Sequence, residues 1–217
     1  SENLALKNIC INIQKGESVG FIGDSGSGKS TLVDVILGLL SPTSGTVKVD
    51  NCDIYNNLRR WQNQIGYVPQ SIYLTDDTLR NNVAFGLPKP DIDEQAVWSA
   101  LKAAQMEKFV EGLPEGLDTI VGERGVRLSG GQRQRIGIAR ALYHEPGVLM
   151  LDEATSSLDS ETEAGVMQAV YALQGKKTIL IVAHRLTTLK NCNQIIEMVD
   201  GKIKRCGTYS EIVGAVG

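Results

Sequence analysis

The chain has 217 residues, 42% of them hydrophobic and 22% charged, which suits one globular domain with a substantial core. Its net charge of −3 argues against a nucleic-acid-binding protein, because such proteins usually carry a basic surplus. The 4 scattered cysteines and 2 histidines predict reduced thiols without a metal cluster, and no apolar run approaches the ~20 residues of a membrane helix.

The first third of the chain alternates between strand and helix patterns. The chain opens on Ser1, and residues 4–13 already alternate like a strand, so we expect a segment of a longer polypeptide. Ser18–Ile22 is typical of a short strand that feeds a glycine-rich turn and then a helix. The apolar face of that helix runs on to Leu40, and Pro42 is expected to end it. Further strands are predicted at residues 46–50 and 64–68.

The middle of the chain, residues 79–143, has a different pattern. Apolar residues recur at helical spacing in three stretches, 94–104, 106–112 and 132–143, and no buried strand is evident. We therefore expect a helical subdomain inserted between strands of the core.

The last third returns to strands. Residues 147–151 and 178–183 are nearly all apolar, as expected of parallel strands buried on both faces. Residues 195–199 and 203–205 flank Asp200-Gly201, a sequence that favours a two-residue hairpin. The spacing of residues 208–211 is that of a capping box and predicts a last short helix. Together these patterns predict an α/β domain with a largely parallel sheet.

A phosphate-binding loop is the first candidate site. It consists of Gly23, Asp24, Ser25, Gly26, Ser27, Gly28, Lys29, Ser30 and Thr31, the pattern G-x-x-x-x-G-K-[ST]. Glycines let several N–H groups point at one anion, and the following helix adds its positive end. Lys29 places a cation against the β- and γ-phosphates, and the Ser30 hydroxyl is a ligand for Mg²⁺. A chance glycine-rich turn of this spacing is expected in about one such chain in a hundred.

Two adjacent acids end an apolar strand at Asp152 and Glu153. The carboxyl ends of parallel strands form the edge of the sheet at which ligands bind. We expect Asp152 to hold Mg²⁺ and Glu153 to orient or deprotonate the attacking water. The alternative is that both acids merely cap the following helix.

A third site is the pentapeptide at residues 128–132, in which Ser129, Gly130, Gly131 and Gln132 precede a helix. A hydroxyl and unobstructed amides at a helix start bind anions, although an ordinary cap would have the same residues. Finding these five residues in order by chance is expected in roughly a few chains in ten thousand.

Taken together, the chain resembles the nucleotide-binding domain of ABC proteins over essentially its whole length. Six segments carry the resemblance in the family's order: Walker A at 23–31, the glutamine loop at 67–70, the signature at 128–132, Walker B at 149–153, the D-loop at 157–159 and the switch at 181–185. The resemblance implies one ABC ATPase domain over residues 1–217. Its expected parts are a RecA-like P-loop NTPase core, an antiparallel β subdomain and a helical subdomain at about 79–143.

The same resemblance implies roles for individual residues. Ser30, Asp152 and Gln70 would hold Mg²⁺, and Gln70 would also reach the transmembrane partner. Glu153, His184 and Gln70 would act in hydrolysis, with His184 at the γ-phosphate. The expected cofactors are ATP and Mg²⁺.

A second nucleotide-binding domain is the partner that the resemblance implies, most simply a second copy of this chain. ATP would lie between the Walker A loop of one subunit and the signature of the other, so Ser129 would contact ATP in trans. Asp159 would cross the interface between the two subunits. No nucleic-acid partner is expected.

Two segments resemble ABC exporters: residues 119–125, a cross-linking loop, and residues 74–86. In exporters this domain follows a six-helix membrane domain, which places it on the cytoplasmic face, here expected at a bacterial inner membrane. Residues 73–86 and 163–193 are most similar to lipid or lipid-linked oligosaccharide flippases. The alternatives are an ABC ATPase of DNA repair or chromosome maintenance, and a catalytically idle heterodimer partner.

One departure concerns adenine. Family members usually stack it on an aromatic residue just upstream of the first strand, and no aromatic residue precedes Phe21 here. We expect that residue to lie upstream of Ser1, and we expect the present chain to bind ATP more weakly as a result.

Overall fold

The computed structural model describes residues 4–123 and 127–214, and its centre is a six-stranded sheet. The strand order is β10-β9-β1-β8-β7-β4. The bounds are β1 (Ser18–Ile22), β4 (Ile65–Val68), β7 (Val148–Asp152), β8 (Thr178–Val182), β9 (Gln194–Val199) and β10 (Lys202–Gly207). Neighbours are parallel except for β9 and β10, which pair antiparallel. The predicted mostly parallel α/β sheet is therefore confirmed.

Helices cover both faces of this sheet, so its central strands are buried on both sides. Met150 and Leu180 pack with Leu32 and Val33 of α1 (Lys29–Ile36) on one face. Their chain neighbours, such as Leu149, belong to the larger apolar cluster of the other face, formed with α6 (Gly130–Leu142) and α7 (Ser160–Tyr171). Alternate side chains of a strand point to opposite faces, which is why these strands are almost wholly apolar.

The prediction that the first helix runs on to Pro42 is wrong. It ends at Ile36, because Gly38 adopts a left-handed conformation with φ of 72°. The N–H of Gly38 donates to Val35 O at 3.1 Å and the N–H of Leu39 to Asp34 O at 2.8 Å, which is a Schellman motif. Leu39 and Leu40 consequently lie on the surface, 64% and 46% exposed.

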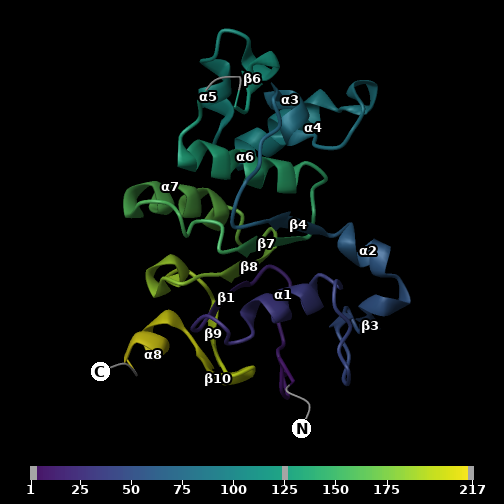
Figure 1. Ribbon diagram of the computed structural model, residues 1–217, viewed down its shortest axis with the longest axis vertical. Coiled ribbons are helices and arrows are strands. Elements are labelled where there is room, and N and C mark those ends of the chain that lie inside the picture. The colour runs from purple at the N-terminus through teal and green to yellow at the C-terminus, as the bar shows by residue number, and fades with distance from the viewer. Residues whose placement is uncertain (1–3, 124–126, 215–217) are drawn as a thin grey trace.

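A group of helices, shown in teal at the top of Figure 1, forms the region predicted to be a helical subdomain. It comprises α3 (Leu79–Val83), α4 (Glu94–Ala103), α5 (Glu107–Glu111) and α6, with short 3₁₀ turns at Lys89–Asp91 and Gly116–Asp118. This region does contain one short strand that the sequence did not suggest, β6 (Ile120–Val121), which pairs with β5 (Asp77–Thr78). The pairing is only two residues long, too short to produce an alternating pattern.

The remaining elements surround α1 and the sheet edge. They are β2 (Lys48–Val49), β3 (Cys52–Asp53), a 3₁₀ turn at Ile54–Asn56, α2 (Leu58–Gln62), a 3₁₀ turn at Leu186–Leu189 and α8 (Tyr209–Gly214). Among the described residues, antiparallel pairing occurs in the small pairs β2–β3 and β5–β6 and in the hairpin of β9 and β10. In that hairpin Asp200 and Gly201 have φ of 48° and 74°, as a two-residue type I′ turn requires.

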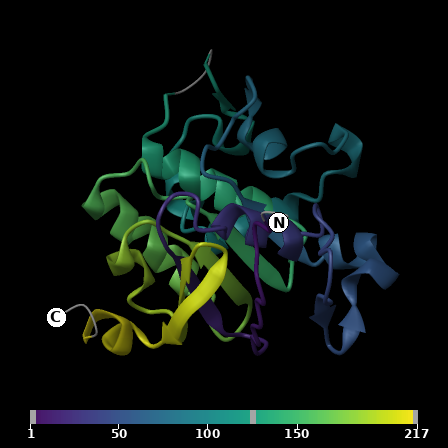
Figure 2. The same cartoon turned by 60° about the horizontal axis from the view of Figure 1, so that its bottom comes forward.

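Residues 4–13 do not form the strand that their alternation predicted. Asn8 has a left-handed φ of 53°, which breaks the extended run. Apolar side chains of this segment, including Leu6 and Ile9, still pack against the α1 face of the core. The N–H of Lys7 donates to Gly201 O at 2.7 Å, and Figure 2 shows the purple N-terminal segment running beside the yellow hairpin.

The two tryptophans lie in different halves of the molecule. Trp61 of α2 is 9% exposed and its indole N–H donates to Ile36 O, at the end of α1, at 2.7 Å. Trp98 of α4 packs, partly buried, against the cluster of the helical region. Among the described helices, none combines the length and apolarity needed to cross a bilayer.

Candidate functional site

The glycine-rich loop joins β1 to α1 and encloses the amine of Lys29. This side chain is 5% exposed, and its Nζ donates to Gly23 O at 2.7 Å and to Asp24 O at 3.0 Å. A Cβ on Gly23 would lie 2.3 Å from Met198 O, so only glycine fits where the loop passes β9. The loop therefore holds a cation against its own carbonyls at the start of a helix.

Ser27 supports a role of this loop in binding an anion. Its Oγ is buried and finds no hydrogen-bond partner among the described residues. A buried hydroxyl without a partner is costly, and a phosphate oxygen is the kind of acceptor that would satisfy it. Together with Lys29 and the positive end of α1, the cradle fits the phosphates of a nucleotide.

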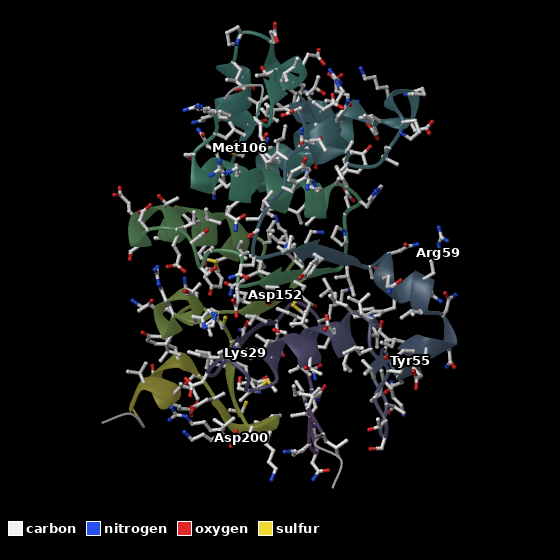
Figure 3. All side chains as sticks on the ribbon, in the orientation of Figure 1. Lys29, Tyr55, Arg59, Met106, Asp152 and Asp200 are labelled. Carbon is white, nitrogen blue, oxygen red and sulfur yellow. The ribbon has the colours of Figure 1, made fainter. Side chains whose placement is uncertain are left out.

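Asp152 ends β7 at the same edge of the sheet. Its Oδ2 accepts a hydrogen bond from the Tyr67 hydroxyl of β4 at 3.1 Å. Burial raises the pKa of Asp152, and the hydrogen bond from Tyr67 and, to a smaller extent, the Lys29 amine partly oppose that rise. Burial and the Asp152 carboxylate raise the pKa of Tyr67 to about 12, so Tyr67 remains a donor. Figure 3 shows Lys29 and Asp152 together in the middle of the molecule.

Glu153 and His184 form a close pair beside Asp152. The Nε2 atom of His184 lies 2.8 Å from Oε1 of Glu153, and the two side chains are 48% and 17% exposed, respectively. Glu153 has a left-handed φ of 51°, an uncommon conformation for this residue, and its N–H donates to Val182 O at 3.0 Å. This turn out of β7 carries the carboxylate toward the end of β8, and such strain is typical of functional sites.

Gln70 lies close to this edge, after β4. Its Nε2 donates to the Ser156 Oγ at 3.3 Å, and its backbone O accepts from Nε2 of the buried Gln134 at 3.4 Å. A hollow of about 230 Å³ opens here, lined by Gln70, Ser71, Ile72, Gly130, Arg133, Gln134 and Ser157.

Mg²⁺ prefers oxygen ligands and usually keeps several from substrate phosphates and water. Ser30, Asp152 and Gln70 offer a hydroxyl, a carboxylate and an amide oxygen, so their chemistry fits this ion. Neither this site nor any other place among the described residues has a group of three or more His, Cys, Asp or Glu side chains that could hold a metal ion. A magnesium site would therefore depend on the nucleotide for most of its ligands.

The signature residues start α6 in the helical half of the molecule, whereas Lys29 starts α1 on the other face of the sheet (Figure 1). Ser129 is exposed, and it forms a capping box with Gln132: Oγ accepts from Gln132 N at 3.2 Å, and Gln132 Oε1 accepts from Ser129 N at 2.8 Å. Within one chain these residues and Lys29 are not brought together.

Next to Ser129 the surface is hollowed by about 320 Å³, lined by Ser129, Gly131, Gln132, Arg135, Glu161, Thr162 and Gly165. Gly131 is required by close packing, because a Cβ there would lie 2.5 Å from Cγ2 of Thr162. Asp159 caps α7 beside this hollow and accepts from Thr162 N at 3.0 Å and from its hydroxyl at 2.6 Å. These hydrogen bonds lower the pKa of Asp159.

Three features of the site were either not predicted from the sequence or lie outside the described residues. Arg124 and Gly125, in the segment that resembles the exporter cross-linking loop, lie outside the described residues. The contact of Tyr67 with Asp152 was missed, although Tyr67 stands three residues before Gln70 in a segment that the sequence singled out. A buried network around Glu163 was also missed, since an acid in the first turn of a helix reads as a surface residue.

The chain is similar to known proteins over most of its length. The ABC transporter family model matches residues 6–156. The chain is 41% identical over 213 residues to the ABC transporter ATP-binding protein YwjA of Bacillus subtilis and 44% identical over 215 residues to the ATP-dependent lipid A-core flippase of Cupriavidus pinatubonensis. Each alignment covers 98% of this chain but only 37% and 36% of those proteins.

The ABC transporter ATM1 of Toxoplasma gondii is 39% identical, with 98% of this chain and 19% of that protein covered. Among solved structures, a bacterial Atm1-family ABC exporter with ATP bound superposes with a TM-score of 0.85 at 33% identity, over 98% of this chain and 37% of that one.

Proposed function

This chain belongs to the ABC transporter family, and from that premise we propose that it is the ATP-hydrolysing domain that powers an exporter. One observation carries the hydrolytic role. Glu153 and His184 leave neighbouring strands and meet at 2.8 Å, at the edge of the sheet where the loop around Lys29 opens.

In the proposed reaction the loop binds ATP through its backbone amides, Lys29 and the Ser27 hydroxyl. Glu153 orients the attacking water and accepts its proton, while His184 holds Glu153 in place and contacts the γ-phosphate. Tyr67 keeps the Asp152 carboxylate turned toward the cradle. When bound between Ser30, Asp152 and Gln70, Mg²⁺ supplies positive charge that offsets the charge on the phosphates.

We further propose that the site is completed by a second copy of the chain. Ser129 is exposed beside an open hollow of about 320 Å³, and the helix that it caps, α6, packs on the face of the sheet opposite to α1, the helix that begins at Lys29. Two copies packed face to face would each bring Ser129 and Asp159 to the nucleotide held by the other. The paired Glu153 and His184 favour an active subunit over an idle heterodimer partner.

An exporter is favoured over a protein of DNA repair or chromosome maintenance by the size of the helical region. Repair and chromosome ATPases of this family insert long coiled coils there, whereas the longest helix of this region among the described residues is α6, with 13 residues. The names of the similar proteins support transport, and the lipid A-core flippases among them support a lipid or lipid-linked oligosaccharide cargo.

We place the contact with a transmembrane domain at Tyr73 and Phe85, which are 73% and 53% exposed. Arg140 fixes both: its Nη1 donates to Tyr73 O at 3.0 Å, and its guanidinium lies 4.6 Å from the centre of the Phe85 ring. Two exposed aromatic side chains in segments that share contacts with one arginine suit a docking surface. This assembly would put the chain on the cytoplasmic face of a membrane, in bacteria the inner membrane.

ATP hydrolysis by the purified chain tests the central proposal. We expect phosphate release that requires Mg²⁺ and is lost in Glu153→Gln, while Glu111→Gln, an exposed acid of α5, hydrolyses like the wild type. A wild-type chain that neither binds nor hydrolyses ATP would overturn the proposal.

A further inference from the structure

Glu163, in the first turn of α7, is a buried acid whose two carboxylate oxygens are both used. It is 7% exposed. Oε1 accepts hydrogen bonds from the Thr155 and Thr188 hydroxyls at 2.8 and 2.7 Å, and Oε2 accepts from Nη1 of Arg185 at 2.7 Å. Burial alone would raise the pKa of Glu163, but these three donors outweigh it and hold the pKa below 4.5. The carboxylate is therefore ionised and fully engaged.

The three donors come from the two loops that carry the hydrolytic pair. Thr155 stands two residues after Glu153, in the loop that follows β7. Arg185 follows His184 directly, at the end of β8, and Thr188 lies in the 3₁₀ turn after it. One carboxylate thus joins the two loops beyond the point where the pairing of β7 and β8 ends.

The same network reaches the loop that caps α7. Nη1 of Arg185 also donates to Leu158 O at 3.4 Å, immediately before Asp159. The other end of α7 fixes the 3₁₀ turn a second time, because the Tyr171 hydroxyl donates to Thr188 O at 2.7 Å. Helix α7 therefore holds the loop of His184 at two points, and its capped end carries Asp159.

Burying a charge costs desolvation free energy, and apolar residues of similar size often stabilise a fold at least as much as a buried ion pair does. A charge with three fixed donors instead sets distances and angles between the segments that supply them. We infer that Glu163 is a positioning residue that fixes the loop of His184 relative to Glu153 and to the loop ending at Asp159. The inference rests on the proposed function, because it takes Glu153 and His184 as the hydrolytic pair.

Three variants test the inference. Glu163→Gln keeps the size of the side chain but removes its charge, so it can no longer accept from all three donors. Arg185→Lys keeps a cation while losing the reach to Leu158 O, and Thr188→Val deletes one hydroxyl with little change in volume. Glu111→Gln, exposed on α5, is the control for loss of one carboxylate.

We expect Glu163→Gln to lower kcat for ATP about 10- to 100-fold, because small displacements of catalytic groups cost that much. The KM for ATP should stay within about threefold, since the three hydrogen-bond donors to Glu163 all lie outside the loop around Lys29. Arg185→Lys and Thr188→Val should lower kcat less. The Arg185→Lys effect should not add to that of Glu163→Gln, because both variants disturb the ion pair between Arg185 and Glu163.

The measurements are steady-state kinetics and ATP binding by calorimetry, with the melting temperature as a check on folding. If Glu163→Gln melts at a lower temperature but keeps its kcat, Glu163 is merely structural and the inference fails. If Glu163→Gln does not fold, the outcome rests on Thr188→Val, and an unchanged kcat there counts against the inference. A wild-type chain without ATPase activity would instead disprove the proposed function.

Discussion

Nε2 of His184 and Oε1 of Glu153 lie 2.8 Å apart although 31 positions separate the two residues in the sequence. The contact arises because β7 and β8 are parallel neighbours in register, with Asp152 opposite Val182. Residues that follow two such strands emerge at the same edge of the sheet. The left-handed turn at Glu153 then faces its carboxylate toward the imidazole.

Glu153→Gln should abolish turnover and leave nucleotide binding intact. Removing the base of a proton transfer typically costs about 10²- to 10⁴-fold in rate, while the amide still fills the same space beside His184. Phosphate release measures the first effect. Size-exclusion chromatography with light scattering in the presence of ATP should detect an accumulated dimer. A variant that hydrolyses at the wild-type rate would remove Glu153 from the role of base.

Lys29→Ala should weaken ATP binding itself by about 10- to 100-fold, the usual cost of losing one charged hydrogen-bond donor. The amine lies inside the loop, within 2.7 Å of Gly23 O, so no other side chain can replace it. Calorimetric titration with ATP measures the change. Lys202→Ala, which removes an exposed lysine of β10, is the matched control and should bind normally. Equal affinities for ATP in Lys29→Ala and Lys202→Ala would show that the loop around Lys29 does not bind the nucleotide.

The ATPase activity per molecule should rise with protein concentration. Each proposed site draws Ser129 from a second copy, so a monomer contains no complete site and activity depends on dimer formation by mass action. Initial rates over about a hundredfold range of concentration provide the measurement. Activity strictly proportional to concentration, in a sample shown to be monomeric, would argue that one chain suffices.

Gly131→Ala should lower both stability and activity. The new methyl would lie 2.5 Å from Cγ2 of Thr162, and overpacking of this kind costs about 1–3 kcal/mol. It would also push the start of α6 away from α7 and from the hollow beside Ser129. Gly214→Ala, where no atom lies within 4 Å of the added Cβ, is the control. Urea unfolding and ATPase rates together provide the comparison, and wild-type values for Gly131→Ala would contradict this packing.

The stabilising contribution of Glu163 should depend on pH. Its pKa is below 4.5 in the fold, so the unfolded chain binds the proton more readily. The contribution is therefore present above about pH 4.5 and is lost as the pH falls through the lower, folded pKa. Urea unfolding at about pH 7 and about pH 4 should show the wild type losing stability relative to Glu163→Gln. If the free energies of unfolding of the wild type and of Glu163→Gln differ by the same amount at both pH values, the hydrogen bonds to Glu163 do not favour its ionised form.

The sequence predicted most of the sheet because its central strands are buried on both faces and so consist of apolar runs. The candidate site residues Asp152 and His184 were singled out because they stand at or just after the ends of such strands, and Lys29 because it closes the glycine-rich pattern that follows β1. Two left-handed residues were not predicted: Asn8 interrupts an apparent strand, and Gly38 ends α1 six residues after Leu32. These turns depend on backbone conformations that apolar periodicity does not record.

The sequence also did not predict contacts between segments that are far apart along the chain. Glu163 looks like any helix-capping acid, and only the folded arrangement of β7, β8 and α7 buries it beneath Arg185. The Tyr67–Asp152 hydrogen bond likewise depends on the register of β4 against β7, in which Tyr67 lies opposite Met150. Neither pair is close in the sequence.

The separation of the two tryptophans gives the molecule two independent optical reporters. With Trp98 changed to Phe, tryptophan fluorescence would arise from Trp61 alone, whose indole N–H donates to the carbonyl at the end of the helix that begins at Lys29. With Trp61 changed to Phe, emission would come from α4 instead. Spectral shifts on adding nucleotide could then be assigned to one half of the molecule without any attached dye.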